Sequence, residues 1–192
     1  MSVKAWALRP TEVKMLSRAA MLRLAARCAM RVEPWKPPGA SAPWKRGLAH
    51  VSRVASTAPA GDAALARSIE NLGVRACNRL DATDEPLGQS HNYAGLALAL
   101  AIEASALDVG PALTKTVIDG AKYAASIAAV LAHAGRVKVG KGKDPVETAA
   151  LAMWDAIRAD LPVVAAAPVR LDARGVRALA PLWPRRTPAW AS

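Results

Sequence analysis

The chain has 192 residues, of which 53% are apolar and 21% charged, and its formal net charge is +11 at pH 7. Its two cysteines, Cys28 and Cys77, are too few for a disulfide framework. The longest apolar run is interrupted by Glu103, which excludes a transmembrane helix of about 18 uncharged residues.

Alanine dominates the apolar residues, and phenylalanine is absent. Alanine is the best helix former and a poor strand former. A chain of this length buries a sizeable core, roughly 70% of the surface that its unfolded form exposes. We therefore predict an all-α fold, a bundle of four to five helices with extended basic arms at both ends.

The charge divides the chain into three parts. Residues 1–60 carry eleven Lys or Arg against two acids, a net charge of +9. Residues 61–168 have a net charge of −2, and residues 169–192 have one of +4. We predict a basic N-terminal arm with one helix and a Pro/Trp-rich linker (1–60), a helical bundle core (61–168) and a basic C-terminal tail (169–192).

The N-terminal arm is predicted to begin with a helix over 11–32, which Glu33-Pro34 terminates. Arg23, Arg27 and Arg31 form a four-spaced stripe along this helix, which is either a solvated flank or a binding surface. Five prolines between 33 and 60 then predict an extended segment without regular structure.

The core is predicted to contain four helices, followed by a short one in the tail. Capping residues and apolar spacing place these helices at 62–80, 91–107, 111–134, 145–160 and 172–180. The second of them is apolar nearly all round, so we expect it to be the most buried. Its acid, Glu103, then needs a buried partner such as Lys122 or Arg158.

The stretch GRVKVGKG at 135–142 contains the glycine and lysine spacing of a phosphate-binding P-loop. A P-loop follows a strand and has Ser or Thr after its lysine, whereas here a predicted helix precedes and Gly142 follows Lys141. We interpret the stretch as a helix connection between a Gly135 cap and an Asp144 cap. The stretch and the residue after it contain four cations, which either contact phosphates or only make a solvent-exposed turn soluble. These cations are Arg136, Lys138, Lys141 and Lys143.

Five of the six tryptophans lie in the two arms, beside prolines and cations. Such segments can stack an indole on a base while the cation reaches a phosphate. The alternatives are that the tryptophans fill grooves on the chain's own helices, or that they anchor on neighbouring subunits. The candidate contact residues are Trp35, Lys36, Trp44, Lys45, Arg46, Trp183, Arg185 and Arg186.

No cluster of residues suffices for catalysis, and the histidines have no metal-ligand spacing, so we expect neither an enzyme nor a cofactor or metal. We expect instead a structural subunit of a ribonucleoprotein that binds RNA or another nucleic acid. The alternative is an adaptor whose Trp/Pro arms anchor on acidic protein subunits. We expect a cytoplasmic protein; the acid-poor, Arg-rich N-terminus makes the mitochondrial matrix the alternative location.

Overall fold

The computed structural model describes residues 7–79, 85–139, 141–168, 170–184 and 187–191. Every regular element in these ranges is a helix, which confirms the all-α prediction. The α-helices are α1 (Pro10–Val13), α2 (Arg18–Arg31), α3 (Ser41–Val54), α4 (Ala63–Arg79), α5 (Glu85–Ala104), α6 (Pro111–His133), α7 (Pro145–Ala165) and α8 (Ala173–Ala178). Two 3-10 turns, η2 (Glu33–Trp35) and η3 (Ala189–Ala191), complete the set.

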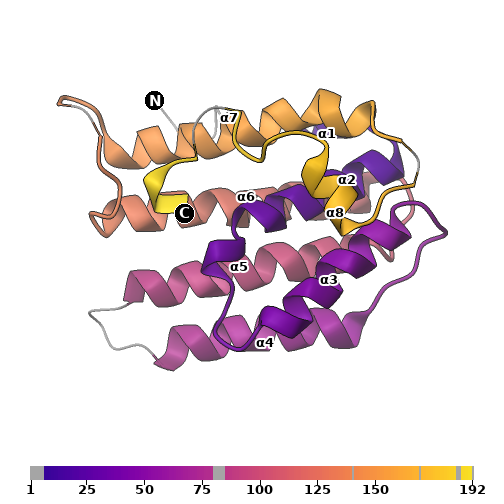
Figure 1. Cartoon of the computed structure of the whole chain (residues 1–192), viewed down its shortest axis with the longest axis horizontal. Coiled ribbons are helices and arrows are strands. Elements are labelled where there is room, and N and C mark those ends of the chain that lie inside the picture. Colours follow the sequence, from indigo (N-terminus) through magenta and orange to yellow (C-terminus); the bar gives the residue numbers. More distant parts are fainter. Residues whose placement is uncertain (1–6, 80–84, 140, 169, 185–186, 192) are drawn as a thin grey trace.

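The helices form two layers (Figure 1). In one layer, α4, α5, α6 and α7 lie side by side in chain order, and successive helices are antiparallel. In the other, α2 crosses α5, α6 and α7, while α3 crosses α4 and α5. The short helix α8 packs on both α2 and α3. None of the described helices combines the length and the apolar character of a membrane-spanning segment.

The core extends well into the first sixty residues. Each residue of α2 from Ala20 to Arg31 is buried, so α2 shares the interior with α5. The helix predicted at 91–107 corresponds to α5, which packs against α2, α3, α4 and α6. The expectation that it is the most buried helix is wrong, because ten of its twenty residues are buried, against twelve of the fourteen in α2. Residues 18–54 therefore pack on the helices of the predicted core and do not form an extended arm.

The predicted helix over 11–32 is divided in two. Residues 14–17 separate α1 from α2, and Ser17 caps α2 by accepting a hydrogen bond from the Ala20 backbone N–H at 3.2 Å. Serine is a strong N-cap residue because its hydroxyl satisfies a free backbone donor. Met15, which an uninterrupted helix would place on its apolar face, is 80% exposed in this break.

The prediction of an irregular linker over 33–60 is wrong for residues 41–54, which form α3. Its proline, Pro43, lies in the first turn, where a backbone N–H has no partner within the helix. Gly47 lets α3 approach the other layer closely: a Cβ there would lie 3.0 Å from Ile102 Cδ1 and 3.1 Å from Leu98 Cδ2.

The boundaries of α4, α6 and α8 agree with prediction to within about two residues. Helix α5 begins six residues earlier than predicted, at Glu85-Pro86, because proline is favourable in a first turn. Helix α7 continues past Pro162 for one turn, in which Val164 is fully buried. Glu103 is exposed, and the buried acid of the described core is Asp160 on α7.

The connection between α6 and α7 has the predicted caps. Gly135 adopts φ 70°, and the Arg136 N–H donates to Leu131 O at 2.9 Å, which ends α6 in a Schellman motif. The Asp144 carboxylate accepts a hydrogen bond from the Val146 N–H at 2.8 Å and so begins α7. A helix precedes this loop, which is not the context of a P-loop.

Candidate basic binding surface

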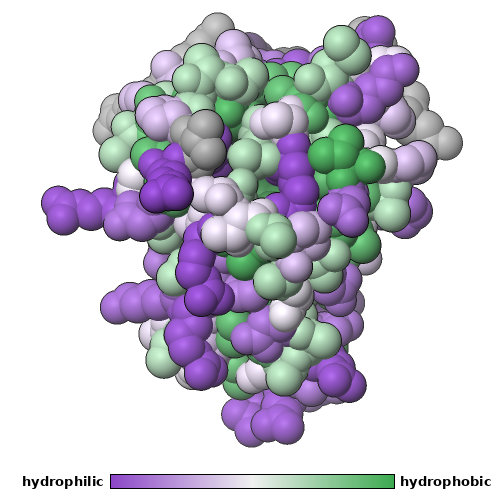
Figure 2. Space-filling model, turned by 90° about the vertical axis from the view of Figure 1, so that its right-hand side faces the viewer, coloured by the Kyte–Doolittle hydropathy of each residue, from purple (hydrophilic) through white to green (hydrophobic). Residues whose placement is uncertain are grey.

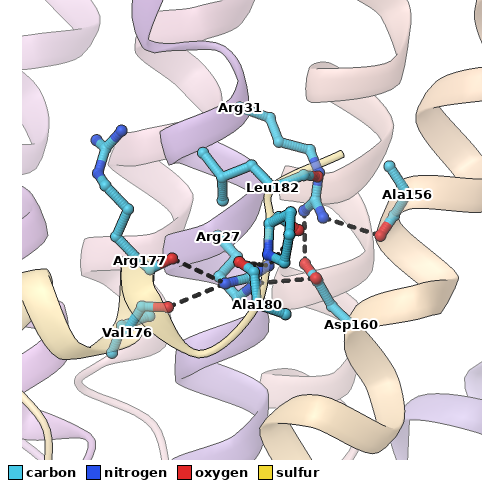
Figure 3. A network of polar contacts seen from close by, with 9 residues as sticks. Arg27, Arg31, Ala156, Asp160, Val176, Arg177, Ala180 and Leu182 are labelled. Carbon is cyan, nitrogen blue, oxygen red and sulfur yellow. Dashed lines mark hydrogen bonds and ion pairs between the residues drawn. The ribbon is translucent and has the colours of Figure 1, made fainter. Parts of the chain in front are cut away.

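The predicted arginine stripe lies inside the molecule. Asp160 forms ion pairs with two arginines of α2: Arg27 Nε lies 2.8 Å from Oδ1, and Arg31 NH1 donates to Oδ2 at 2.5 Å (Figure 3). The side chains of Arg27 and Arg31 have no exposed surface. Because one carboxylate faces two guanidinium groups, the remaining donors need other acceptors.

Backbone carbonyls of the C-terminal segment supply these acceptors. Arg27 donates to Val176 O and Ala180 O, both at 3.0 Å, and Arg31 Nε donates to Leu182 O at 2.6 Å. Arg31 NH2 also donates to Ala156 O of α7 at 2.8 Å. Figure 3 shows that these bonds converge between α2, α7 and the segment at 176–182. The two arginines thus hold the C-terminal segment on the helical body.

The other arginines of α2 behave similarly. Arg18 donates to Leu107 O at 2.9 Å, Val54 O at 3.0 Å and Ser105 O at 2.7 Å. Arg23 is 3% exposed, and its NH1 lies 3.5 Å from Ala167 O. Burial lowers the pKa values of Arg18, Arg23 and Arg27; nearby Asp108 and Asp160 partly offset this for Arg18 and Arg27 respectively. Arg23, Arg27 and Arg31 therefore do not form an external contact surface in this structure.

Trp35 and Trp44 are packed against the protein itself. Trp44 is 0% exposed, and its Nε1 has no hydrogen-bond partner among the described residues, so its role is apolar packing. Trp35 is half-buried in η2, and its carbonyl faces His91 Nδ1 at 2.9 Å. Lys36 is also half-buried, beside the C-terminal segment.

The C-terminal tryptophans pack on each other. Trp183 and Trp190 meet edge to face, with ring centroids 5.4 Å apart, and each is 8% exposed. Neither ring therefore offers a free face for a base. The neighbouring candidates Arg185 and Arg186 lie outside the described residues.

The outer face of α3 carries exposed cations. Lys45, Arg46 and Arg53 are all exposed, and at 3.6 residues per turn they lie within an arc of about 100° around the helix axis. The sequence of α3, SAPWKRGLAHVSRV, contains no acid. Among the described residues, neither Lys45 nor Arg46 makes an ion pair.

Helix α8 extends this surface, because it packs on α3 and exposes Arg174 and Arg177. Arg177 pairs with Glu33, and Asp172 caps α8 by accepting from the Gly175 N–H at 2.7 Å. We call the five cations of α3 and α8 the basic face: Lys45, Arg46, Arg53, Arg174 and Arg177. Hydrophilic side chains project at the left edge of Figure 2, which is the side of α3 and α8.

The basic loop between α6 and α7 is separate from this face. Its valines anchor it, since Val137 is 7% exposed and Val139 is half-buried. Its cations point outward and are exposed: Arg136, Lys138, Lys141 and Lys143. A hollow of about 530 Å³ beside Lys143 is also lined by Asp144, Glu147 and Asp155, and these carboxylates disfavour a phosphate there.

Sequence reasoning found Lys45 and Arg46 but missed Arg53, Arg174 and Arg177. The spacing of the exposed positions 42, 45, 46, 49 and 53 was the available signal, because it follows one face of a helix. The proline-rich context had excluded a helix there. No local signal connects α8 with α3, since that contact is tertiary.

In the part of the chain that the structure describes, no three His, Cys, Asp or Glu side chains gather closely enough to hold a metal ion. No protein-family model, curated protein or solved structure matches the chain.

Proposed function

We propose that the chain is a non-catalytic subunit that binds the phosphate backbone of a nucleic acid through the basic face. One observation carries this proposal: α3 presents three exposed cations on one side and has no acid of its own. Lysine and arginine that neutralise phosphates release counterions, which is the main source of sequence-independent affinity.

The burial of Trp44 and Trp183 favours binding that does not depend on base stacking. Base stacking needs an accessible aromatic face, but Trp44 has no exposed surface and Trp183 is 8% exposed. Phosphate contacts position a protein on nucleic acid without reading its sequence. We therefore expect affinity that depends strongly on salt and weakly on base sequence.

The alternative, an adaptor whose tryptophans anchor on partner proteins, has less support than the nucleic-acid proposal. It requires Trp35, Trp44 and Trp183 to insert into partner proteins. Trp44 and Trp183 already fill the interior of this chain. An acidic protein partner would instead have to meet the cations alone, and the salt dependence of such pairs is expected to be smaller than that of a polyanion.

The test is a titration of the full chain against labelled single-stranded RNA and duplex DNA at two salt concentrations. The variant Lys45→Glu, Arg46→Glu, Arg53→Glu removes three cations of α3. For duplex DNA, the slope of log affinity against log salt should become shallower by about two to three, because each phosphate contact contributes about 0.9.

The matched control reverses three exposed cations of the loop, Arg136→Glu, Lys138→Glu and Lys141→Glu, which changes the net charge by the same amount. We expect it to weaken binding much less. Equal losses in the two triple variants would show that only the net charge matters, and a larger loss in the loop variant would move the site to the loop.

A further inference from the structure

A groove whose lining includes no residue of the basic face is largely apolar. It lies between the N-terminal segment and the start of α6 and has a volume of about 520 Å³. Met21 and Ile118 line it and are buried, at 0% and 6% exposed. Pro10 lines its N-terminal side, and Val109 and Pro111 line its α6 side.

Exposed apolar side chains continue from this groove onto the surface. Val109, at its edge, is 61% exposed, and Met15, which follows the lining residue Lys14, is 80% exposed. The third large apolar side chain exposed in the described part of the chain, Val74, belongs to α4. Figure 2 views the end at which α5 passes into α6 and shows exposed hydrophobic side chains beside hydrophilic ones. Two large exposed apolar side chains thus lie in or next in sequence to the lining of one apolar groove, which favours a contact site there.

Cations flank the groove on both sides. Lys14 lies on the N-terminal side, and Lys115 and Lys122 lie on the α6 side. One carboxylate, Asp119, accepts from both α6 lysines: from Lys115 Nζ at 2.7 Å and from Lys122 Nζ at 2.9 Å. Its pKa is lowered, because burial, which raises it, is outweighed by these two hydrogen bonds. The lining of the groove thus includes three ammonium groups and one carboxylate, so it carries a net positive charge.

We propose that this groove binds an acidic amphipathic helix of a partner protein. An apolar ridge on such a helix fits the groove between Met21 and Ile118, and acids on both sides of the ridge face Lys14 and the α6 lysines. The exposed side chains beyond the groove favour this occupant over a single fatty acid, because they would remain in water around a small ligand. This surface is separate from the basic face, so the two proposals stand independently.

The test uses the full chain and three synthetic helical peptides of equal length. One has a leucine ridge flanked by glutamates, the second replaces glutamate with lysine, and the third is a scrambled acidic sequence. Anisotropy should show saturable binding of the first peptide, at least about tenfold tighter than of the other two. In an NMR titration, its addition should shift the amide signals of 14–21 and 109–122 and leave α3 unchanged.

Two double variants test whether the acidic peptide binds in the groove. Met15→Ser with Val109→Ser changes exposed side chains only, so the fold should persist, and it should weaken the acidic peptide at least about tenfold. Lys14→Glu with Lys115→Glu should weaken it by a similar factor. The matched control, Val74→Ser on α4, should leave the affinity unchanged.

Three outcomes overturn the proposal. The first is that the acidic peptide shows no saturable binding. The second is that Met15→Ser with Val109→Ser leaves its affinity unaffected. The third is that oleate or phosphatidylglycerol vesicles bind in a way that depends on the groove residues, while the peptide does not bind. The α3 charge reversal separates this result from the nucleic-acid proposal, because it should not change peptide affinity.

Discussion

Helices α2 and α3 have the same length and similar charge, yet their cations lie in opposite environments. Both come from the first sixty residues, and neither contains an acid. In α2 every residue from Ala20 to Arg31 is buried, arginines included. In α3 only one face is buried, and Lys45, Arg46 and Arg53 are exposed.

The difference shows that a cationic stripe is no evidence of a surface without knowledge of what covers the helix. Helix α2 lies between the row α5–α7 and the segment at 173–182, so no side of it faces water. Its arginines can be buried because their guanidinium groups donate to backbone carbonyls of irregular segments, and because Arg27 and Arg31 share the Asp160 carboxylate. Helix α3 is covered on one side, and its cations occupy the other.

The largest expected loss of stability comes from a substitution on the buried side of α3. Trp44→Ala removes a fully buried indole and should lower the free energy of unfolding by about 3–5 kcal/mol. Urea denaturation followed by circular dichroism measures this loss. Trp35→Ala, the same substitution at a half-buried position, should cost less, and equal losses would contradict the assignment of Trp44 to the core.

The next effect concerns the interior of α2. Asp160→Asn keeps the side-chain volume but leaves Arg27 and Arg31 without their shared carboxylate. Loss of one partner of a buried ion pair costs about 3–5 kcal/mol, and we expect the lower end because carbonyl acceptors remain. The control is Asp155→Asn, an exposed acid of the same helix, which should change the free energy of unfolding by less than about 0.5 kcal/mol.

The same substitution should also loosen the C-terminal segment, since Arg27 and Arg31 donate to Ala180 and Leu182. Limited proteolysis near residues 183–191 should be faster in Asp160→Asn than in the control. A segment that stays equally protected would show that Trp183 and Trp190 hold it without the arginines.

The sequence predicts best where local signals decide. Asp144 with Pro145, Gly135 and Asp172 mark helix ends through their own backbone chemistry, and each prediction is confirmed. The sequence-based prediction fails at 33–60 because a run of prolines indicates a break in regular structure, whereas Pro43 lies in the first turn of α3, where its missing N–H costs nothing.

The candidate site was predictable only in part for a similar reason. Lys45 and Arg46 are adjacent in sequence and were found, whereas Arg53 belongs with them only if the segment is a helix. The interior role of Arg31 depends on Asp160, 129 residues away, and no local pattern indicates such a contact. The sequence shows which residues are cationic, but it does not show which side of the fold they occupy.

The smallest expected effect tests the exposed side of α3. Lys45→Gln, Arg46→Gln and Arg53→Gln should each change the free energy of unfolding by less than about 0.5 kcal/mol, because exposed cations away from ion pairs contribute little to stability. The combined variant can even be slightly more stable, since the chain has a net charge of +11 and the substitutions reduce self-repulsion. Arg27→Gln on α2 should lose far more. A comparable loss on α3 would show that its cations support the fold, and the basic face would then lack the spare charge on which nucleic-acid binding depends.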